Sequence, residues 1–130
     1  MSRPSEADVA TAVIAAFTAA NARPFDIDDI PDGAARPKAY TEVMVTRKYS
    51  GDAPRRLGVA VTDSTAFRVT TRAVADTIDG AREARRRVAT CEGIPISVIG
   101  ISGVLRFESE DAIGPDDDWF SGLTTWTFVL

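Results

Sequence analysis

Apolar residues near the start of the chain recur with the spacing of a helix that is buried on one side. They stand mostly three or four positions apart and are Val9, Ala12, Val13, Ala16, Phe17 and Ala20. Ser5, followed three residues later by Asp8, has the spacing of a capping box, in which two side chains satisfy free backbone N–H groups at a helix start. This pattern predicts an amphipathic helix over residues 6–20.

A second stretch with helical spacing covers residues 77–91. Its apolar stripe consists of Ile78, Ala81, Ala84, Val88 and Cys91. Asp76 or Thr77 fits the N-cap position. Gly93 suits the position just after a helix that ends near Glu92. We therefore predict a second amphipathic helix, which carries arginines on its remaining faces.

The other apolar segments are rich in β-branched and aromatic residues and predict strands. They cover residues 40–49, 65–73, 95–108 and 122–130. The third is either one long strand or two strands broken near Gly100 and Gly103, because glycines inside strands often mark bulges. The first two belong to a β-hairpin region over residues 40–73, in which residues 57–62 form either a short strand or the hairpin tip.

Residues 21–39 lack such a pattern, and we expect a long loop there. They hold several prolines, and apolar residues alternate with aspartates over part of the stretch, so that part can pack as an extended segment. The element order along the chain is then α-β-β-α-β-β. This order predicts a single α+β domain over residues 1–130, with a mostly antiparallel or mixed sheet backed by two helices.

Composition narrows the classes of function. The chain has 130 residues, of which 45% are hydrophobic, as in an ordinary globular domain. It has no histidine and a single cysteine, which removes the usual neutral-pH general base, His-ligated metal sites, Cys–His nucleophiles and disulfides within the chain. No glycine-rich phosphate or dinucleotide motif occurs. We therefore expect no catalytic residue, no metal and no cofactor, and a protein that is not an enzyme.

Hydropathy and charge argue against a membrane-spanning protein and a general nucleic-acid binder. The longest apolar-leaning stretches, residues 9–20 and 94–105, are too short and too polar to span a bilayer, and no signal peptide is recognisable. The chain has 15 basic against 19 acidic residues, a net charge of −4, which argues against a general nucleic-acid binder. The small net charge is the sum of two regions of opposite charge, one basic and one acidic.

The second predicted helix holds the basic region, which consists of Arg82, Arg85, Arg86 and Arg87. It is either a solvated helix face, with an ion pair from Glu83 to Arg86, or a protein interface. No aromatic residue is interleaved there to stack on a base, which disfavours nucleic acid.

Residues 106–118 hold the acidic region, with six acids against one arginine and thus a local charge of −5. The acids are Glu108, Glu110, Asp111, Asp116, Asp117 and Asp118. The spacing of a calcium-binding helix–loop–helix is absent, so we expect a solvated loop or a segment that faces basic residues of another subunit.

Two pairs of residues, one in this region and one directly after it, are candidates for a functional site. Glu108 and Glu110 are alternate residues of a predicted strand, so their carboxylates would share one face, but no convergent partner suggests acid–base chemistry. Trp119 and Phe120 fall in a predicted loop, where large aromatic side chains need a surface to pack on. That surface is either their own domain or a neighbouring subunit, for which they would be interface anchors.

Two long blocks of the sequence carry a resemblance. The first is residues 67–88, FRVTTRAVADTIDGAREARRRV, and the second is residues 106–130, RFESEDAIGPDDDWFSGLTTWTFVL. RAVADT followed by AREARRR, and the ending with ESED, IGPDD and SGLTTWT, are its strongest parts. Together they resemble the small tail terminator proteins of siphophages that infect actinobacteria, which are also called tail completion or minor tail proteins.

The resemblance implies a sheet backed by helices and a structural function in the virion. Such terminators form a hexameric ring that caps the head-proximal end of the tail tube and stops its polymerisation. The implied partners are further copies of the chain, the tail tube protein and the head-completion or stopper protein. DNA only passes through the lumen, without sequence-specific binding, and no membrane is involved. The implied location is the virion tail, after synthesis in the host cytoplasm.

In a head-to-tail ring each subunit offers two different surfaces. We hypothesise that the arginine-rich helix and the acidic segment 108–118 lie on or near such complementary surfaces. The acidic excess would also suit a lumen that must not hold passing DNA, because carboxylates repel phosphates. Two alternatives remain: another neck component, such as an adaptor or stopper, and a cellular α+β domain that binds a small ligand or acts as an enzyme.

Overall fold

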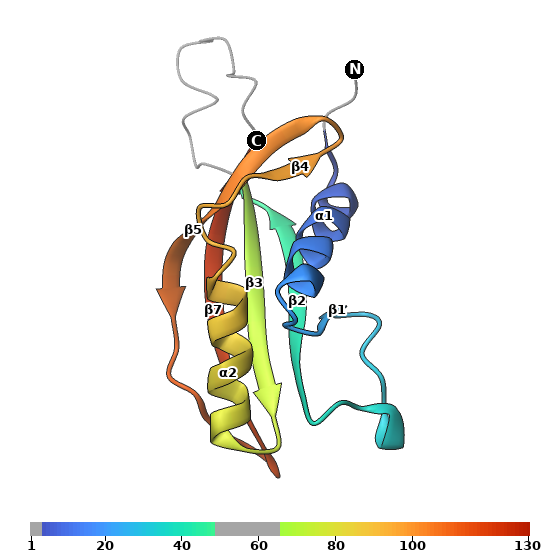
Figure 1. The fold of residues 1–130 in the computed structure, drawn as a ribbon, viewed down its shortest axis with the longest axis vertical. Coiled ribbons are helices and arrows are strands. Elements are labelled where there is room, and N and C mark those ends of the chain that lie inside the picture. The colour runs from blue at the N-terminus through green and yellow to red at the C-terminus, as the bar shows by residue number, and fades with distance from the viewer. Residues whose placement is uncertain (1–3, 49–65) are drawn as a thin grey trace.

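Two helices cover one face of a curled, mixed sheet, to which the described part of the chain contributes seven strands (Figure 1). This is a computed structural model, which describes residues 4–48 and 66–130. The short strand or hairpin tip expected at residues 57–62 lies outside the described residues. The predicted α+β class, with a mixed sheet backed by two helices, is confirmed.

Helix α1 spans Glu6–Ala19, one residue shorter than predicted. The capping box is present, because the Ser5 hydroxyl accepts from the backbone N–H of Asp8 at 3.1 Å and the Asp8 carboxylate accepts from the N–H of Ser5 at 2.8 Å. The bond from the backbone of Ser5 lowers the pKa of Asp8. Val9, Val13 and Phe17 are fully buried, so the apolar stripe faces the sheet as expected.

Helix α2 spans Ile78–Ala89, and Thr77 rather than Asp76 is its N-cap, with its hydroxyl accepting from the N–H of Gly80 at 3.0 Å. The helix ends two residues earlier than the predicted residue 91, with Thr90 as its C-cap. Gly93 does adopt a positive φ of 75°. It turns the chain toward β5, where its N–H donates to the carbonyl of Leu105, instead of closing the last helical turn.

The sheet has the order β1-β2-β3-β7-β5-β4, and β6 also pairs with β7. Its strands are β1 (Pro24–Asp26), β2 (Ala39–Arg47), β3 (Ala66–Ala75), β4 (Ile96–Val98), β5 (Ile101–Glu110), β6 (Gly114–Asp116) and β7 (Trp119–Val129). Only β1 and β2 run parallel; the other described pairs are antiparallel. In this order β3, from the middle of the chain, and β7, from its C-terminal end, lie side by side at the centre of the sheet.

Two boundaries differ from the sequence prediction. The expected loop 21–39 contains β1 and a 3-10 turn at Gly33–Ala35, since the N–H of Ile27 donates to the carbonyl of Val43 and fixes the segment beside β2. The expected linker 109–122 contains β6 and the first part of β7. Of the two alternatives for residues 95–108, the broken strand is observed: a two-residue turn at Ile99 and Gly100, both with positive φ, divides it into β4 and β5.

The core lies between the helices and the sheet. Alternate residues along each strand point to opposite faces, and the helix-facing set holds the large apolar side chains. The largest side chains of the sheet that are 2% exposed or less are Trp126, Tyr40, Phe67, Phe128 and Leu105, and all but Tyr40 belong to the core cluster with Val9, Val13 and Phe17. The opposite face carries Thr70, Arg72, Leu123 and Thr127, all partly exposed, and no described helix covers it. Among the described residues, no helix is long and apolar enough to cross a membrane.

Candidate functional site

Arg85, from the predicted basic cluster, lies on the inner side of α2 and holds the helix to the sheet. Its side chain is only 15% exposed. One terminal nitrogen, Nη2, donates to the carbonyl of Asp111 at 2.7 Å and to that of Leu123 at 3.5 Å, while Nη1 lies 3.3 Å from a carboxylate oxygen of Glu110. Gly122 makes this approach possible, because a Cβ there would collide with Nη2. Arg85 therefore stabilises the packing of α2 on the sheet within one chain.

The other three arginines of the cluster remain on the outer sides of α2. Each pairs with a carboxylate one turn earlier: Arg82 with Asp79 at 3.3 Å, and Arg86 and Arg87 with Glu83 at 2.6 and 3.2 Å. The hydrogen bond from Arg86 lowers the pKa of Glu83 to about 2. These pairs leave the guanidinium groups of Arg82 and Arg86 more than 60% exposed. Arg87 also donates to the carbonyl of Asn21.

Glu108 and Glu110 do not share a face of β5, contrary to the prediction. A bulge between Phe107 and Ser109 shifts the register by one residue, so the alternation is broken at Glu108. The Glu108 carboxylate accepts from Nζ of Lys48 at 2.7 Å, and this bond lowers its pKa. Glu110 instead turns toward α2 and Arg85. The two carboxylates therefore form no acid–base pair.

The remaining acids of the predicted segment belong to the β6–β7 hairpin and the turn before it. Asp117, with a φ of 56°, and Asp118 form the exposed hairpin turn. Asp116 accepts from the Ser121 hydroxyl at 3.0 Å and lies 3.7 Å from Arg72. Asp111 uses its backbone to bind Leu123 and Arg85, and its side chain is exposed. The acidic segment thus contacts α2 within the same chain at one end and projects into solvent at the other.

Trp119 packs on its own domain, at the start of β7. The guanidinium of Arg36 stacks over its ring at 4.0 Å, and the ring of Tyr40 meets it edge-on at 6.4 Å. Arg36 also donates to the Tyr40 hydroxyl at 2.9 Å, while burial raises the pKa of Tyr40. Phe120, half-buried, pairs across the sheet with Ala75 and Pro115. Of the two surfaces expected for Trp119, its own domain is therefore the one observed.

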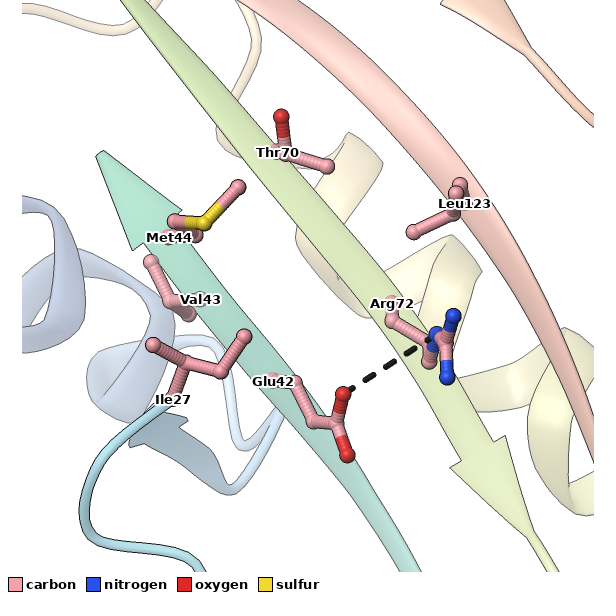
Figure 2. A pocket seen from close by; sticks show the side chains of 7 residues that line it. All are labelled: Ile27, Glu42, Val43, Met44, Thr70, Arg72 and Leu123. Atoms are coloured by element: carbon pink, nitrogen blue, oxygen red, sulfur yellow. Dashed lines mark ion pairs between the residues drawn. The ribbon is translucent and has the colours of Figure 1, made fainter. Parts of the chain in front are cut away.

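Sequence reasoning missed a hollow on the open face of the sheet, beside the end of β1. Ile27, Val43, Met44 and Leu123 form its apolar lining, and Thr70, Glu42 and Arg72 complete it (Figure 2). Its volume is about 280 Å³, and an ion pair of 3.9 Å joins Glu42 to Arg72 at its side. Ile27 is 47% and Met44 41% exposed. In the sequence, only the alternation of Ile27 with aspartates indicated this surface. The rest could not be predicted, because strands far apart in the sequence pair to form it.

A second hollow lies at the opposite edge of the sheet, between α2 and the β5–β6 connection. Arg82, Arg85 and Arg86 line it from the helix, and Glu110, Ala112 and Ile113 line it from the connection. Its volume is about 480 Å³. Within residues 4–48 and 66–130, no three acidic or cysteine side chains are grouped as they would be around a metal ion. The described surfaces offer charge, aromatic faces and apolar hollows, the components of protein–protein contacts.

Comparison with known proteins identifies the fold and leaves the function open. No protein family and no curated protein matches this chain. A solved structure of a protein without a descriptive name is similar to it, with a TM-score of 0.63 over 96% of this chain and 94% of the other. The two sequences are 14% identical, so this similarity concerns the fold alone.

Proposed function

We propose that this chain is a siphophage tail terminator, a structural virion protein. It forms a ring of identical subunits on the head-proximal end of the tail tube, stops tube polymerisation and presents the surface to which the head-completion protein binds. DNA passes through the lumen of the ring. The protein acts by binding its neighbours and performs no reaction.

The observation that carries this proposal is the packing of the two blocks that resemble terminators. Residues 67–88 form most of β3 and α2, and residues 106–130 form half of β5 with β6 and β7. β3 and β7 pair along ten residues each, from Ala66 with Val129 to Ala75 with Phe120. Arg85 of the first block binds Glu110, Asp111 and Leu123 of the second. The two blocks that resemble terminators fold into one unit. This supports the interpretation that the chain and the terminators share a structure, rather than two unrelated local matches.

The distribution of charge also supports a subunit that meets other proteins. Exposed arginines on α2 and exposed aspartates on the β6–β7 turn occupy separate parts of the surface. Unlike patches on one chain suit head-to-tail contacts, in which each subunit uses two different surfaces. An overall acidic chain also suits a channel for DNA, because it does not hold phosphates.

Tail length in a virus that lacks this gene tests the proposal. The proposal predicts tails of uncontrolled length that are not attached to heads, as seen by negative-stain electron microscopy. Expression of the wild-type chain in trans should restore tails of uniform length. Normal tails without the gene would overturn the proposal. Tails of normal length that fail to join heads would also overturn it, in favour of a neck adaptor or stopper.

A further inference from the structure

Side-chain carboxylates occupy one backbone N–H on each side of the sheet. On β2, beyond the short strand β1, Glu6 accepts from the backbone N–H of Arg47 at 2.5 Å. On β5, beyond β4, Glu92 accepts from the backbone N–H of Phe107 at 2.7 Å. Unpaired edge N–H groups are what a further strand would bind, and these two are already paired within the chain.

The edge that carries β1 is acidic and partly apolar. Residues 24–35 contain four aspartates and no lysine or arginine, a local charge of −4. Within residues 4–48 and 66–130, none of these aspartates lies within ion-pair distance of a cation. Asp28 and Asp29 are exposed, and they follow the exposed Ile27 at the rim of the apolar hollow in Figure 2. We call Ile27, Asp28, Asp29, Asp32 and Met44 the acidic edge.

The outer side of α2, which borders the hollow beside β5, is basic, and Glu110 of β5 lines the same hollow from across it. Helix α2 has four arginines against Asp79 and Glu83, a net charge of +2. Arg82 and Arg86 remain 63% and 64% exposed after pairing, on the wall of the hollow beside Ile113. Phe107, on the neighbouring edge strand β5, is 51% exposed. We call Arg82, Arg86, Phe107 and Ile113 the basic edge.

We propose that the acidic edge of one copy docks on the basic edge of a second copy. The first surface lies at the β1 end of the strand order, and the second lies between α2 and β5, toward the other end (Figure 1). Each matches the other in charge and in exposed apolar side chains, and neither matches itself. Such a contact is heterologous, so it repeats from copy to copy and closes into a ring when the rotation allows. The inference rests on the proposed function and assigns the surfaces that build its ring.

This assignment differs from the pairing that the sequence suggested. The acidic partner expected for the arginine helix was the segment 108–118, and Glu110 of that segment is instead bound to Arg85 within the chain. The aspartates that follow β1 replace it as the partner of the exposed arginines. Asp117 and Asp118, on the β6–β7 turn, lie outside the proposed contact.

Charge reversal on each edge, followed by mixing, tests the proposal. One full-length variant carries Asp28→Arg with Asp29→Arg, and the other carries Arg82→Glu with Arg86→Glu. In either variant alone, like charges would meet across the contact, which should weaken it by about 100-fold or more. An equimolar mixture brings unlike charges together at every contact, so it should assemble with alternating subunits. Asp117→Arg with Asp118→Arg is the matched control, which reverses two exposed aspartates outside both edges.

Mass measurement by light scattering at low salt distinguishes the outcomes. The proposal predicts that the wild type and the control assemble, that each edge variant is monomeric, and that the mixture regains the wild-type mass. Circular dichroism reports whether the variants are folded, and recovery in the mixture cannot arise from unfolded chains. Variants that assemble alone, or a mixture that stays monomeric, overturn these surfaces but leave the terminator function standing. A wild type that stays monomeric at every concentration overturns the contact as well, and tail length then tests the function separately.

Discussion

Arg85 and Arg86 are neighbours in the sequence but lie on different sides of α2. Arg85 is 15% exposed and contacts a carboxylate and two carbonyls of the β5–β7 region. Arg86 is 64% exposed and contacts Glu83, one turn earlier on its own helix. Arg85 thus joins two parts of the fold, whereas Arg86 remains available to a partner.

This difference shows why a cluster of like charges cannot be assigned a single function. A buried guanidinium needs partners for its donors, and both terminal nitrogens of Arg85 have them, while its buried Nε has none among the described residues. It is therefore costly to disturb. An exposed guanidinium with one i,i+3 partner contributes little to the fold and loses little when a new partner replaces water. We expect substitutions on the two sides of α2 to separate stability from assembly.

Arg85→Ala should have the largest effect on stability. The substitution removes the donor to the carbonyl of Asp111 and the cation beside the Glu110 carboxylate, while the carbonyl of Leu123 keeps its bond from the N–H of Asp111. The free energy of unfolding should fall by about 2–3 kcal/mol. Urea unfolding followed by circular dichroism measures this loss. Arg86→Ala is the matched control and should lower the unfolding midpoint much less, because it removes only an exposed ion pair. Equal losses for the two variants would contradict the division of α2 into an inner and an outer side.

Gly122→Ala should have the next largest effect, through the same contact. Its Cβ would occupy the place of Nη2 of Arg85 and press on Ile113, so Arg85 must move from its carbonyl partners. We expect a loss of about 1–3 kcal/mol, the usual range for overpacking. In the Arg85→Ala background most of this cost should vanish, since the colliding atoms are absent. Fully additive losses in a double-mutant cycle would show that Gly122 acts independently of Arg85.

The outer side of α2 should contribute a smaller, pH-dependent effect. Hydrogen bonding by Arg86 lowers the pKa of Glu83 from 4.5 to about 2, so this carboxylate stabilises the folded state above pH 4.5. That contribution is lost as the pH falls toward 2, because a lowered pKa means that the unfolded chain binds the proton first. Thermal unfolding between pH 5 and pH 2 should therefore show a smaller decline for Glu83→Gln than for the wild type. Identical declines would contradict the ion pairs of α2.

The sequence predicted the elements that have a long, regular pattern. Both helices were predicted from their apolar stripes and caps, and β3 and β7 from their β-branched and aromatic residues. The three-residue strand β6 was missed, and β1 was expected only as an extended part of a loop, because both are too short to show a period. Pairing with β7 and with β2 stabilises them. The bulge in β5, which separates Glu108 from Glu110, has no local signature such as a glycine at that point.

The sequence predicted which types of residue the candidate site contains, but not which individual residues are free to bind a partner. Arg82 and Arg86 are exposed as an interface requires, but nothing in the sequence distinguishes them from Arg85, whose partners lie more than 20 residues away. Trp119 has its cation in Arg36 and its aromatic neighbour in Tyr40, both from the other half of the chain. Such contacts depend on which strands become neighbours, and this order is not encoded in any one segment.

Covalent capture of the proposed contact tests the central claim most directly. A chain with both Asp28→Cys and Arg86→Cys carries one thiol on each edge, and the native Cys91 is only 7% exposed. Treated with a short bis-maleimide linker, it should give a ladder of covalent oligomers that ends at the hexamer, while either single substitution gives no species beyond a dimer. A ladder that requires both thiols is the result we predict. Monomers alone, or a double variant that stops at the dimer, would contradict head-to-tail assembly through these two edges.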